Sequence, residues 1–181
     1  MIFSTKTLSL NGPVEHRRGA ILPLFAILFP VLFVLVAFVI NIAYIQLTGT
    51  QLQIATDSAA RAAGRMYQLT DDETVALEFA NQAGRANLVA GDPLQFDLED
   101  LEFGTSTRHS VDSRYQFSSD GDNKNSVRVF GKRTNASSNG RVNTFLPNII
   151  GTSDFKLSSV CLLYTSPSPR DATLSRMPSS A

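Results

Sequence analysis

The chain has few of the residues on which most catalytic and metal centres depend. Its 181 residues include one cysteine, no tryptophan and two histidines. His16 and His109 are far apart and lie on segments of different character, so they do not predict a shared metal site. No serine–histidine–aspartate set, phosphate-binding loop or metal-ligand spacing occurs. The sequence therefore predicts a protein that is not an enzyme, with no catalytic residue, no cofactor, no metal and no small-molecule substrate.

The chain also has no excess of charge of either sign. Its 16 lysine and arginine residues balance 16 aspartate and glutamate residues, so nucleic acid is not an expected partner. Oxygen donors do cluster in residues 120–125, but Lys124 stands where a third donor would be needed and no distal bidentate glutamate is present. This segment predicts a solvated turn and not a calcium site.

What the chain does have is a long apolar run. A basic cluster at residues 16–19 precedes residues 20–45, whose one polar residue is Asn41. A bilayer core about 30 Å thick takes roughly 20 apolar residues in a helix, so residues 20–45 predict a single transmembrane helix. A cleavable secretory signal is the alternative, but its apolar region is about 7–15 residues long and ends at a small-residue site. The run here is longer and leads into Tyr44 and Ile45, which favours an uncleaved anchor.

The distribution of basic residues predicts the orientation of this helix. Lys6, Arg17 and Arg18 precede the apolar run, and the next basic residue is Arg61. Positive charge is retained on the cytoplasmic side. We therefore expect a cytoplasmic N-terminus at residues 1–19 and an exported domain at residues 46–160.

The C-terminal tail, residues 161–181, is predicted to be non-native. Cys161–Asp171 back-translates to a sequence that looks like the transposon end and adapter of a sequencing library, and Ser175–Ala181 back-translates to the distal arm of that adapter. Such segments are excluded from fold reasoning. The natural chain is then expected to break off near Val160, and the loss of Cys161 leaves no argument for or against disulfides.

The exported part predicts a small α+β domain. The helix is expected to continue to about Arg65, with an Asp57–Arg61 pair on its surface and a stripe of small and apolar residues. The stripe comprises Leu47, Leu52, Ala55, Ala59, Ala62 and Ala63. Thr70–Glu73 resembles a capping box and predicts the start of a second helix that ends before Gly91.

The apolar face of this second helix is predicted at Val75, Phe79, Ala83, Ala86 and Leu88. An antiparallel meander then follows from alternating residues. Its strands are expected at residues 95–103 with a turn at Gly104, at 114–117, at 126–133 with Val127 and Val129 on one face, and from 155 to 160. Polar loops are expected at 120–125 and 135–140, and an apolar patch at 145–151.

These motifs together resemble a known family. Arg17–Ala20 before the apolar run and Leu52–Gly64 after it are similar to the N-terminal region of the TadE/TadG-like proteins of the tight-adherence (Flp) pilus machinery. Ordered similarities continue downstream as far as Val160. The resemblance implies a pilin-like fold in the bacterial inner membrane, with the C-terminal domain in the periplasm or outside the cell. It also implies a non-enzymatic role in pilus assembly or as a minor-pilin-like structural protein, with the lipid bilayer and other pilus proteins as partners through helix packing.

The sequence departs from the family pattern at two places. Asn41–Ala43 stands where the family usually has Asp-x-Gly, and Leu24 stands where substrates of prepilin peptidase usually have glutamate. We therefore expect no cleavage after Gly19. The alternative function is the N-terminal anchor of a larger periplasmic sensor, von Willebrand A-type adhesion protein or enzyme whose working domain lies beyond the truncation.

Overall fold

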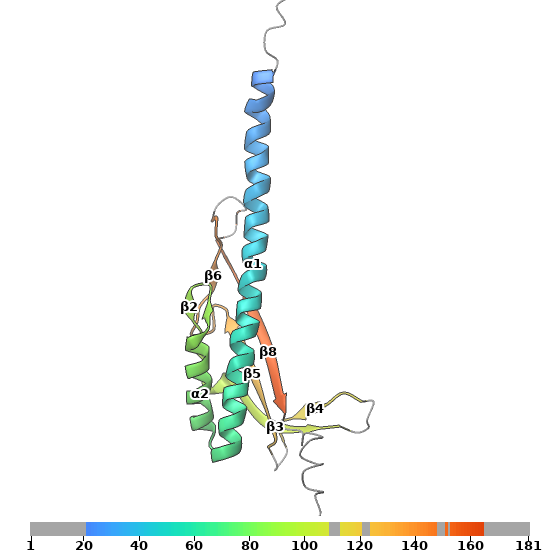
Figure 1. Ribbon diagram of the computed structural model, residues 1–181, viewed down its shortest axis with the longest axis vertical. Coiled ribbons are helices and arrows are strands. Elements are labelled where there is room, and N and C mark those ends of the chain that lie inside the picture. Colours follow the sequence, from blue (N-terminus) through green and yellow to red (C-terminus); the bar gives the residue numbers. More distant parts are fainter. Residues whose placement is uncertain (1–20, 109–112, 121–123, 148–150, 152, 165–181) are drawn as a thin grey trace, which may run out of the picture.

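The computed structural model describes residues 21–108, 113–120, 124–147, 151 and 153–164. The predictions made on residues 1–20, on His109 and on residues 121–123 lie outside this part of the chain. One helix, α1 (Ile21–Thr70), dominates the molecule and is followed by α2 (Glu73–Ala86). Figure 1 shows that the N-terminal half of α1 extends away from the rest of the chain, while α2 and the strands gather around its C-terminal half.

The remaining elements are short strands and one 3-10 helix. They are β1 (Leu88–Val89), β2 (Asp92–Pro93), η1 (Leu98–Asp100), β3 (Leu101–Thr107), β4 (Gln116–Ser118), β5 (Ser126–Arg133), β6 (Val142–Asn143), β7 (Asp154–Phe155) and β8 (Leu157–Tyr164). An antiparallel sheet has the order β4-β3-β5-β8, and β1-β2 and β6-β7 form two-stranded ladders. The predicted α+β class is confirmed. The strand order differs from a simple meander, because β3 and not β4 is the neighbour of β5.

The predicted continuation of the apolar helix is confirmed and goes further than expected. α1 has 50 residues, which is about 75 Å at 1.5 Å per residue. Gly64 does not end it; the helix stops at Thr70, before Asp71 adopts a positive φ of 53°. Pro30 lies inside the helix, as membrane helices allow. The helix is long and apolar enough to cross a membrane, and the side chains of its apolar part are almost all exposed.

The C-terminal half of α1 buries one face against the domain. Its buried residues are Thr48, Leu52, Ala55, Thr56, Ala59, Ala60, Ala63, Gly64 and Tyr67. Leu47 was wrongly placed on this face: its side chain is 55% exposed, because five residues of helix rotate it well away from Leu52. The predicted Asp57–Arg61 pair is also wrong, since Asp57 instead accepts a hydrogen bond from Gln53 at 3.2 Å.

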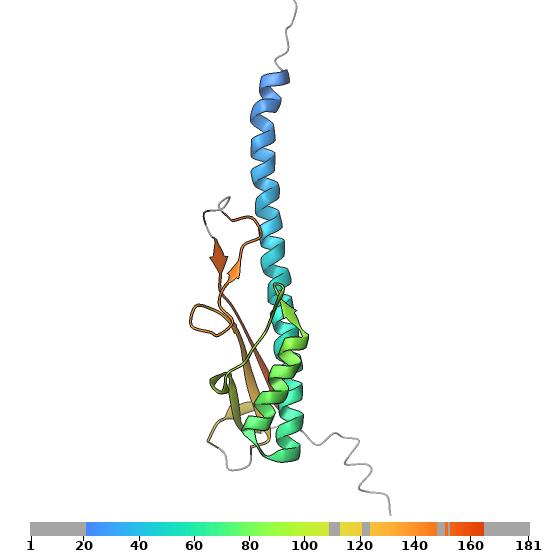
Figure 2. The same ribbon diagram turned by 90° about the vertical axis from the view of Figure 1, so that its left-hand side faces the viewer.

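α2 is present where it was predicted, but its cap and its buried face differ. Asp72 is the N-cap and accepts hydrogen bonds from the amides of Thr74 and Val75, whereas Thr70 is the last residue of α1. The buried residues are Ala76, Ala80 and Gly84, and the predicted Phe79 is 37% exposed. Small residues allow close packing on this face: a Cβ at Gly84 would lie 2.7 Å from the carbonyl oxygen of Leu94 and 2.8 Å from the ring of Phe96. Figures 1 and 2 show α2 lying along the C-terminal half of α1.

The strands were predicted with mixed success. Residues 126–133 form β5, with Val127 and Val129 both buried, and the polar loop at 135–140 is confirmed. Residues 95–97 are not a strand: Asn81 and Asn139 hold the backbone of Gln95 and Phe96 through side-chain hydrogen bonds. Gly104 lies within β3 and is not a turn.

The last strand continues past the predicted boundary of the natural chain. β8 pairs with β5 from Leu157 to Tyr164, so residues 161–164 take part in the sheet. Backbone pairing accepts many sequences and does not test where these residues come from. The predicted origin of residues 161–181 therefore stays a prediction.

Close contact between α1 and the sheet depends on small residues. The hydroxyl oxygens of Thr56 on α1 and Ser159 on β8 are 2.5 Å apart and share a hydrogen bond. Gly131 on β5 lies directly beneath them, and a Cβ at this position would be 2.0 Å from Oγ1 of Thr56. The helix can pack on the sheet at this point only because residue 131 has no side chain.

Candidate functional site

The described residues contain no arrangement typical of catalysis or metal binding. No group of three histidine, cysteine, aspartate or glutamate side chains that could hold a metal ion occurs among them. The segment considered as a calcium site includes residues 121–123, which lie outside the described part. At its end, Nζ of Lys124 is 2.6 Å from a carboxylate oxygen of Glu73, so this lysine joins the loop to the start of α2.

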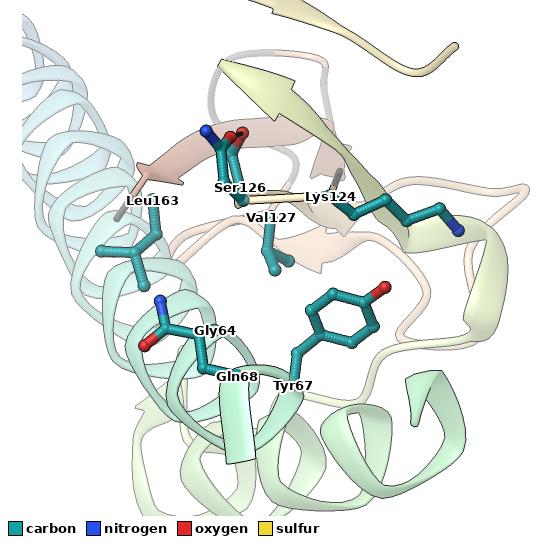
Figure 3. A pocket seen from close by; sticks show the side chains of 8 residues that line it. Gly64, Tyr67, Gln68, Lys124, Ser126, Val127 and Leu163 are labelled. Atoms are coloured by element: carbon teal, nitrogen blue, oxygen red, sulfur yellow. Dashed lines mark hydrogen bonds between the residues drawn. The ribbon is translucent and has the colours of Figure 1, made fainter. Parts of the chain in front are cut away.

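A small, partly open pocket lies between the end of α1 and β5 (Figure 3). Gly64, Tyr67, Lys124, Val127 and Leu163 are among the residues that line it, and its volume is about 10 Å³. A single water needs about that much, so no organic ligand fits. Burial and a hydrogen bond to Asp71 raise the pKa of Tyr67, which keeps its phenol neutral at physiological pH. The space is a packing feature of the core and not a binding site.

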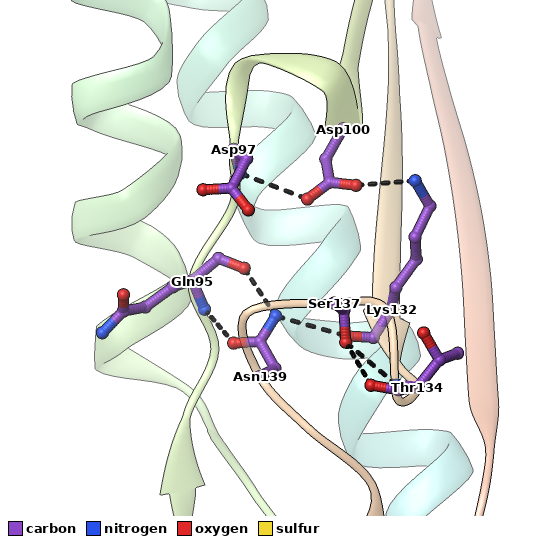
Figure 4. Close-up of polar contacts among 7 residues, drawn as sticks. All are labelled: Gln95, Asp97, Asp100, Lys132, Thr134, Ser137 and Asn139. Atoms are coloured by element: carbon purple, nitrogen blue, oxygen red, sulfur yellow. Dashed lines mark hydrogen bonds and ion pairs between the residues drawn. The ribbon is translucent and has the colours of Figure 1, made fainter.

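A second polar cluster joins the β5–β6 connection to the segment before β3 (Figure 4). Asn139 accepts a hydrogen bond from the Gln95 amide at 2.7 Å and donates to the Gln95 carbonyl at 2.7 Å. Nζ of Lys132 contacts Asp100 at 2.7 Å, and Asp100 also accepts from the amide of Asp97 at 3.1 Å. Each carboxylate and amide named here has a partner within the cluster, so these residues hold two loops together.

A groove with two arginines lies beside the β6–β7 ladder. Arg133 and Arg141 line it, together with Tyr44 and Phe145. Each arginine already has an acidic partner: Arg133 contacts Asp92 at 2.9 Å, and Arg141 contacts Asp154 at 2.5 Å. The hydrogen bond from Arg141 is the main reason that the pKa of Asp154 is lowered. Each guanidinium group is therefore paired with a carboxylate, although Nε of both arginines is buried without a hydrogen-bond partner.

The most distinctive contact involves the one polar residue of the apolar run. Asn41 is 2% exposed and Ala37, one turn before it, is also buried, although most side chains in this part of α1 are exposed. Its Nδ2 donates to the carbonyl of Leu146 at 3.2 Å, and its Oδ1 accepts from the amide of Leu146 at 3.0 Å. One side chain therefore satisfies both backbone groups of a residue 105 positions away. We call this pair of hydrogen bonds the Asn41 clamp.

Aromatic side chains surround the Asn41 clamp. The ring of Tyr44, one turn further along α1, lies 5.9 Å from the ring of Phe145 and 6.3 Å from that of Phe155. Phe145 and Phe155 belong to the β6–β7 hairpin, residues 142–155, which Figures 1 and 2 show beside α1 and nearer its N-terminal half than the sheet is. The Asn41 clamp and the three rings fix the hairpin to the helix.

Sequence reasoning noticed Asn41 only as a departure from a family pattern. A stronger signal was available, because a polar side chain in an apolar helix requires a hydrogen-bond partner. The identity of that partner could not be read from the sequence, since Leu146 offers only its backbone.

Gly19, after which we expect no cleavage, and the basic residues Arg17 and Arg18 lie outside the described residues. Leu24 is within α1 and its side chain is 62% exposed.

Comparison with known proteins gives one match. No curated protein and no solved structure matches the chain. Residues 19–66 match the family model described as "Putative Flp pilus-assembly TadE/G-like", which covers most of α1, including the apolar run and the buried small-residue face. The resemblance to the TadE/TadG-like family predicted from the sequence is thereby confirmed over residues 19–66.

Proposed function

We propose that this chain is a membrane-anchored, non-enzymatic component of Tad/Flp pilus assembly, or a minor-pilin-like structural protein of that system. The match of residues 19–66 supports an association with Flp pilus assembly. The observation that carries the proposal is the form of α1: one continuous helix whose first half is apolar and exposed and whose second half is the core of a small domain. Such a helix suits a protein that works by holding a domain at a membrane.

The exposed half of α1 is the surface that we propose for helix packing with other pilus proteins. The stripe of small and apolar residues on the second half of α1 is not free for this role, since Leu52, Ala55, Ala59 and Ala63 pack in the core of the domain. The remaining apolar surface runs from Ile21 to Ile42. Association of helices in a bilayer depends on close side-chain packing, so partner contacts there depend on the shape of the helix and not on apolarity alone.

A deletion with two complementing genes tests this proposal. Loss of the gene should abolish pilus assembly without slowing growth, and the natural gene should restore it. A matched variant in which residues 21–40 are replaced by leucine keeps the anchor but changes the packing surface. We expect it to reach the membrane and fail to restore pili. Normal pili in the deletion strain would refute the assembly role, and restoration by the leucine variant would refute helix packing as its basis.

We also propose that the N-terminus is cytoplasmic, that the domain lies in the periplasm or outside the cell, and that the chain is not cut after Gly19. Basic residues Lys6, Arg17 and Arg18 support the orientation. A reporter active only in the periplasm, fused after Val160, should be active. Intact mass of the membrane-extracted protein should include residues 1–19; a species beginning at Ala20 would refute the proposal on processing.

The sequence of the natural gene past Val160 discriminates between this proposal and a larger protein. A sensor, enzyme or von Willebrand A-type domain encoded there would reassign the chain as the anchor of that domain. A stop codon shortly after the end of β8 would support the small assembly component.

A further inference from the structure

The Asn41 clamp holds residues 145–147 at the level where the apolar part of α1 ends. These three residues follow β6, and the name hairpin tip refers to them alone. Residues Ile21–Ile40 are all apolar. At 1.5 Å per residue they span about 30 Å, the thickness of a bilayer core. Asn41 is the next residue, and it contacts Leu146 directly. If α1 crosses a membrane, Leu146 and its neighbours therefore lie at the boundary between hydrocarbon and head groups.

The Asn41 clamp reduces the cost of such a position, because it pairs both backbone groups of Leu146. Irregular backbone is tolerated beside hydrocarbon only where its amide and carbonyl groups have partners. Leu146 has a partner for both, and the amide of Thr144 donates to the carbonyl of Ser153 at 2.9 Å across the hairpin. The same hydrogen bonds stabilise the side chain of Asn41, since burying an unpaired amide at this depth would be costly.

The side chains at the hairpin tip are apolar and face outward. Phe145 is 60% exposed and Pro147 is exposed. They are continuous with the apolar surface of α1, where Ile40 and Ile42 are 39% and 40% exposed. Tyr44, which contacts Phe145, lies about 4.5 Å further along the helix, the level at which tyrosine is enriched in membrane proteins.

We infer that the tip of the β6–β7 hairpin is a second membrane contact, in which Phe145 and Pro147 enter the interfacial layer of the lipid bilayer beside α1. Lipid is the occupant, because the tip continues a helix surface that lipid already covers and stands at the height of the interface. The contact gives the domain two points of attachment, α1 and the hairpin, and so restricts how far the domain can tilt against the membrane. This inference depends on α1 crossing the bilayer and not on a role in pili.

The absence of tryptophan makes the test direct. Phe145→Trp introduces a single fluorophore at the tip, and Pro147→Trp is a second reporter if the first disturbs folding. Phe33→Trp, in the middle of the apolar run, reports on crossing, and Phe79→Trp, on α2, is the matched control in the domain. The full chain is reconstituted in phospholipid vesicles with and without bromine on the acyl chains, and tryptophan emission is compared.

We expect brominated lipid to quench the tryptophans at positions 33 and 145 and to leave position 79 unchanged, with emission at 145 shifted to shorter wavelength than at 79. Quenching at 33 but at neither 145 nor 147 would overturn the inference while leaving the membrane anchor in place. A blue shift at 145 without quenching would overturn it in favour of a protein covering the tip. No quenching at 33 would overturn both the anchor and the inference.

Discussion

Gly131→Ala is the sharpest perturbation of the contact between α1 and the sheet. A Cβ at residue 131 would lie 2.0 Å from Oγ1 of Thr56 and 2.9 Å from Oγ of Ser159. Neither hydroxyl can move easily, because they are bonded to each other at 2.5 Å and Thr56 also donates to the Leu52 carbonyl at 2.7 Å. The methyl group must therefore separate helix and strand or break these hydrogen bonds.

The expected loss of stability follows from these two costs. Overpacking a close-packed core costs about 1–3 kcal/mol, and a disrupted hydrogen bond adds about 1 kcal/mol. We expect Gly131→Ala to lower the free energy of unfolding by about 2–4 kcal/mol. Thr56→Ala removes the atom that clashes, so the double variant should be more stable than the sum of the single effects by about 1–3 kcal/mol.

Urea unfolding of the full chain in detergent micelles, followed by circular dichroism, measures these differences. Gly49→Ala is the control for the same substitution without a clash, because Gly49 lies in α1 and a Cβ there would meet nothing within 4 Å. Replacing glycine by alanine within a helix should raise stability by up to about 1 kcal/mol. If Gly131→Ala unfolds at the same urea concentration as the parent, or if Thr56→Ala gives no relief, the packing described here is wrong.

Three further predictions concern single contacts. Asn41→Leu removes the Asn41 clamp and leaves two backbone groups of Leu146 unpaired, which costs about 1–3 kcal/mol for each group. Hydrogen exchange at the Leu146 amide should therefore accelerate, while the Val129 amide in β5 stays protected. Unchanged exchange at Leu146 would count against the clamp. Hydrogen bonds from the Thr74 hydroxyl and from the amides of Thr74 and Val75 lower the pKa of Asp72. The stability that Asp72 contributes is therefore present above its unfolded pKa of about 3.9 and is lost as pH falls through its folded pKa. Asp72→Ala should unfold at a lower urea concentration than the parent at neutral pH, and the two midpoints should converge in acid. A difference in midpoint that does not change with pH would contradict this. Burial and, to a smaller extent, a hydrogen bond to Asp57 raise the pKa of the Cys161 thiol to about 12. Alkylation of Cys161 at mildly alkaline pH should therefore be slow in the folded chain and fast in urea. Equal rates would show that β8 stops before Cys161.

The parts of the fold that were predictable are those set by local pattern. The apolar run, its continuation beyond Ile45 and the alternation in β5 depend on residues close together in the sequence. A long run without charges predicts an apolar helix, and the N-terminal half of α1 is such a helix with almost all of its side chains exposed.

The errors come from contacts between distant segments. The period in α2 allowed two faces, and the larger side chain of Phe79 favoured the wrong one. What decides between the faces is packing against distant segments of the chain, which buries Ala76, Ala80 and Gly84. A Cβ at residue 84 would lie 2.7 Å from the carbonyl of Leu94, so this face cannot be exchanged for the other. Residues 95–97 failed as a strand for a similar reason, since Asn81 and Asn139 bond to their backbone from elsewhere in the chain.

The difference between this chain and the family pattern at residue 41 has a physical explanation in the Asn41 clamp. The family usually has aspartate in this part of the sequence, and an ionised carboxylate can only accept hydrogen bonds. Leu146 presents an amide that donates and a carbonyl that accepts, and the two face the same side chain. A side-chain amide matches both groups, whereas a carboxylate would match the first and repel the second. Asparagine therefore fits this helix because of a hairpin that follows it by 105 residues, and Asn41→Asp should lose the hydrogen bond to the Leu146 carbonyl while keeping the one from its amide.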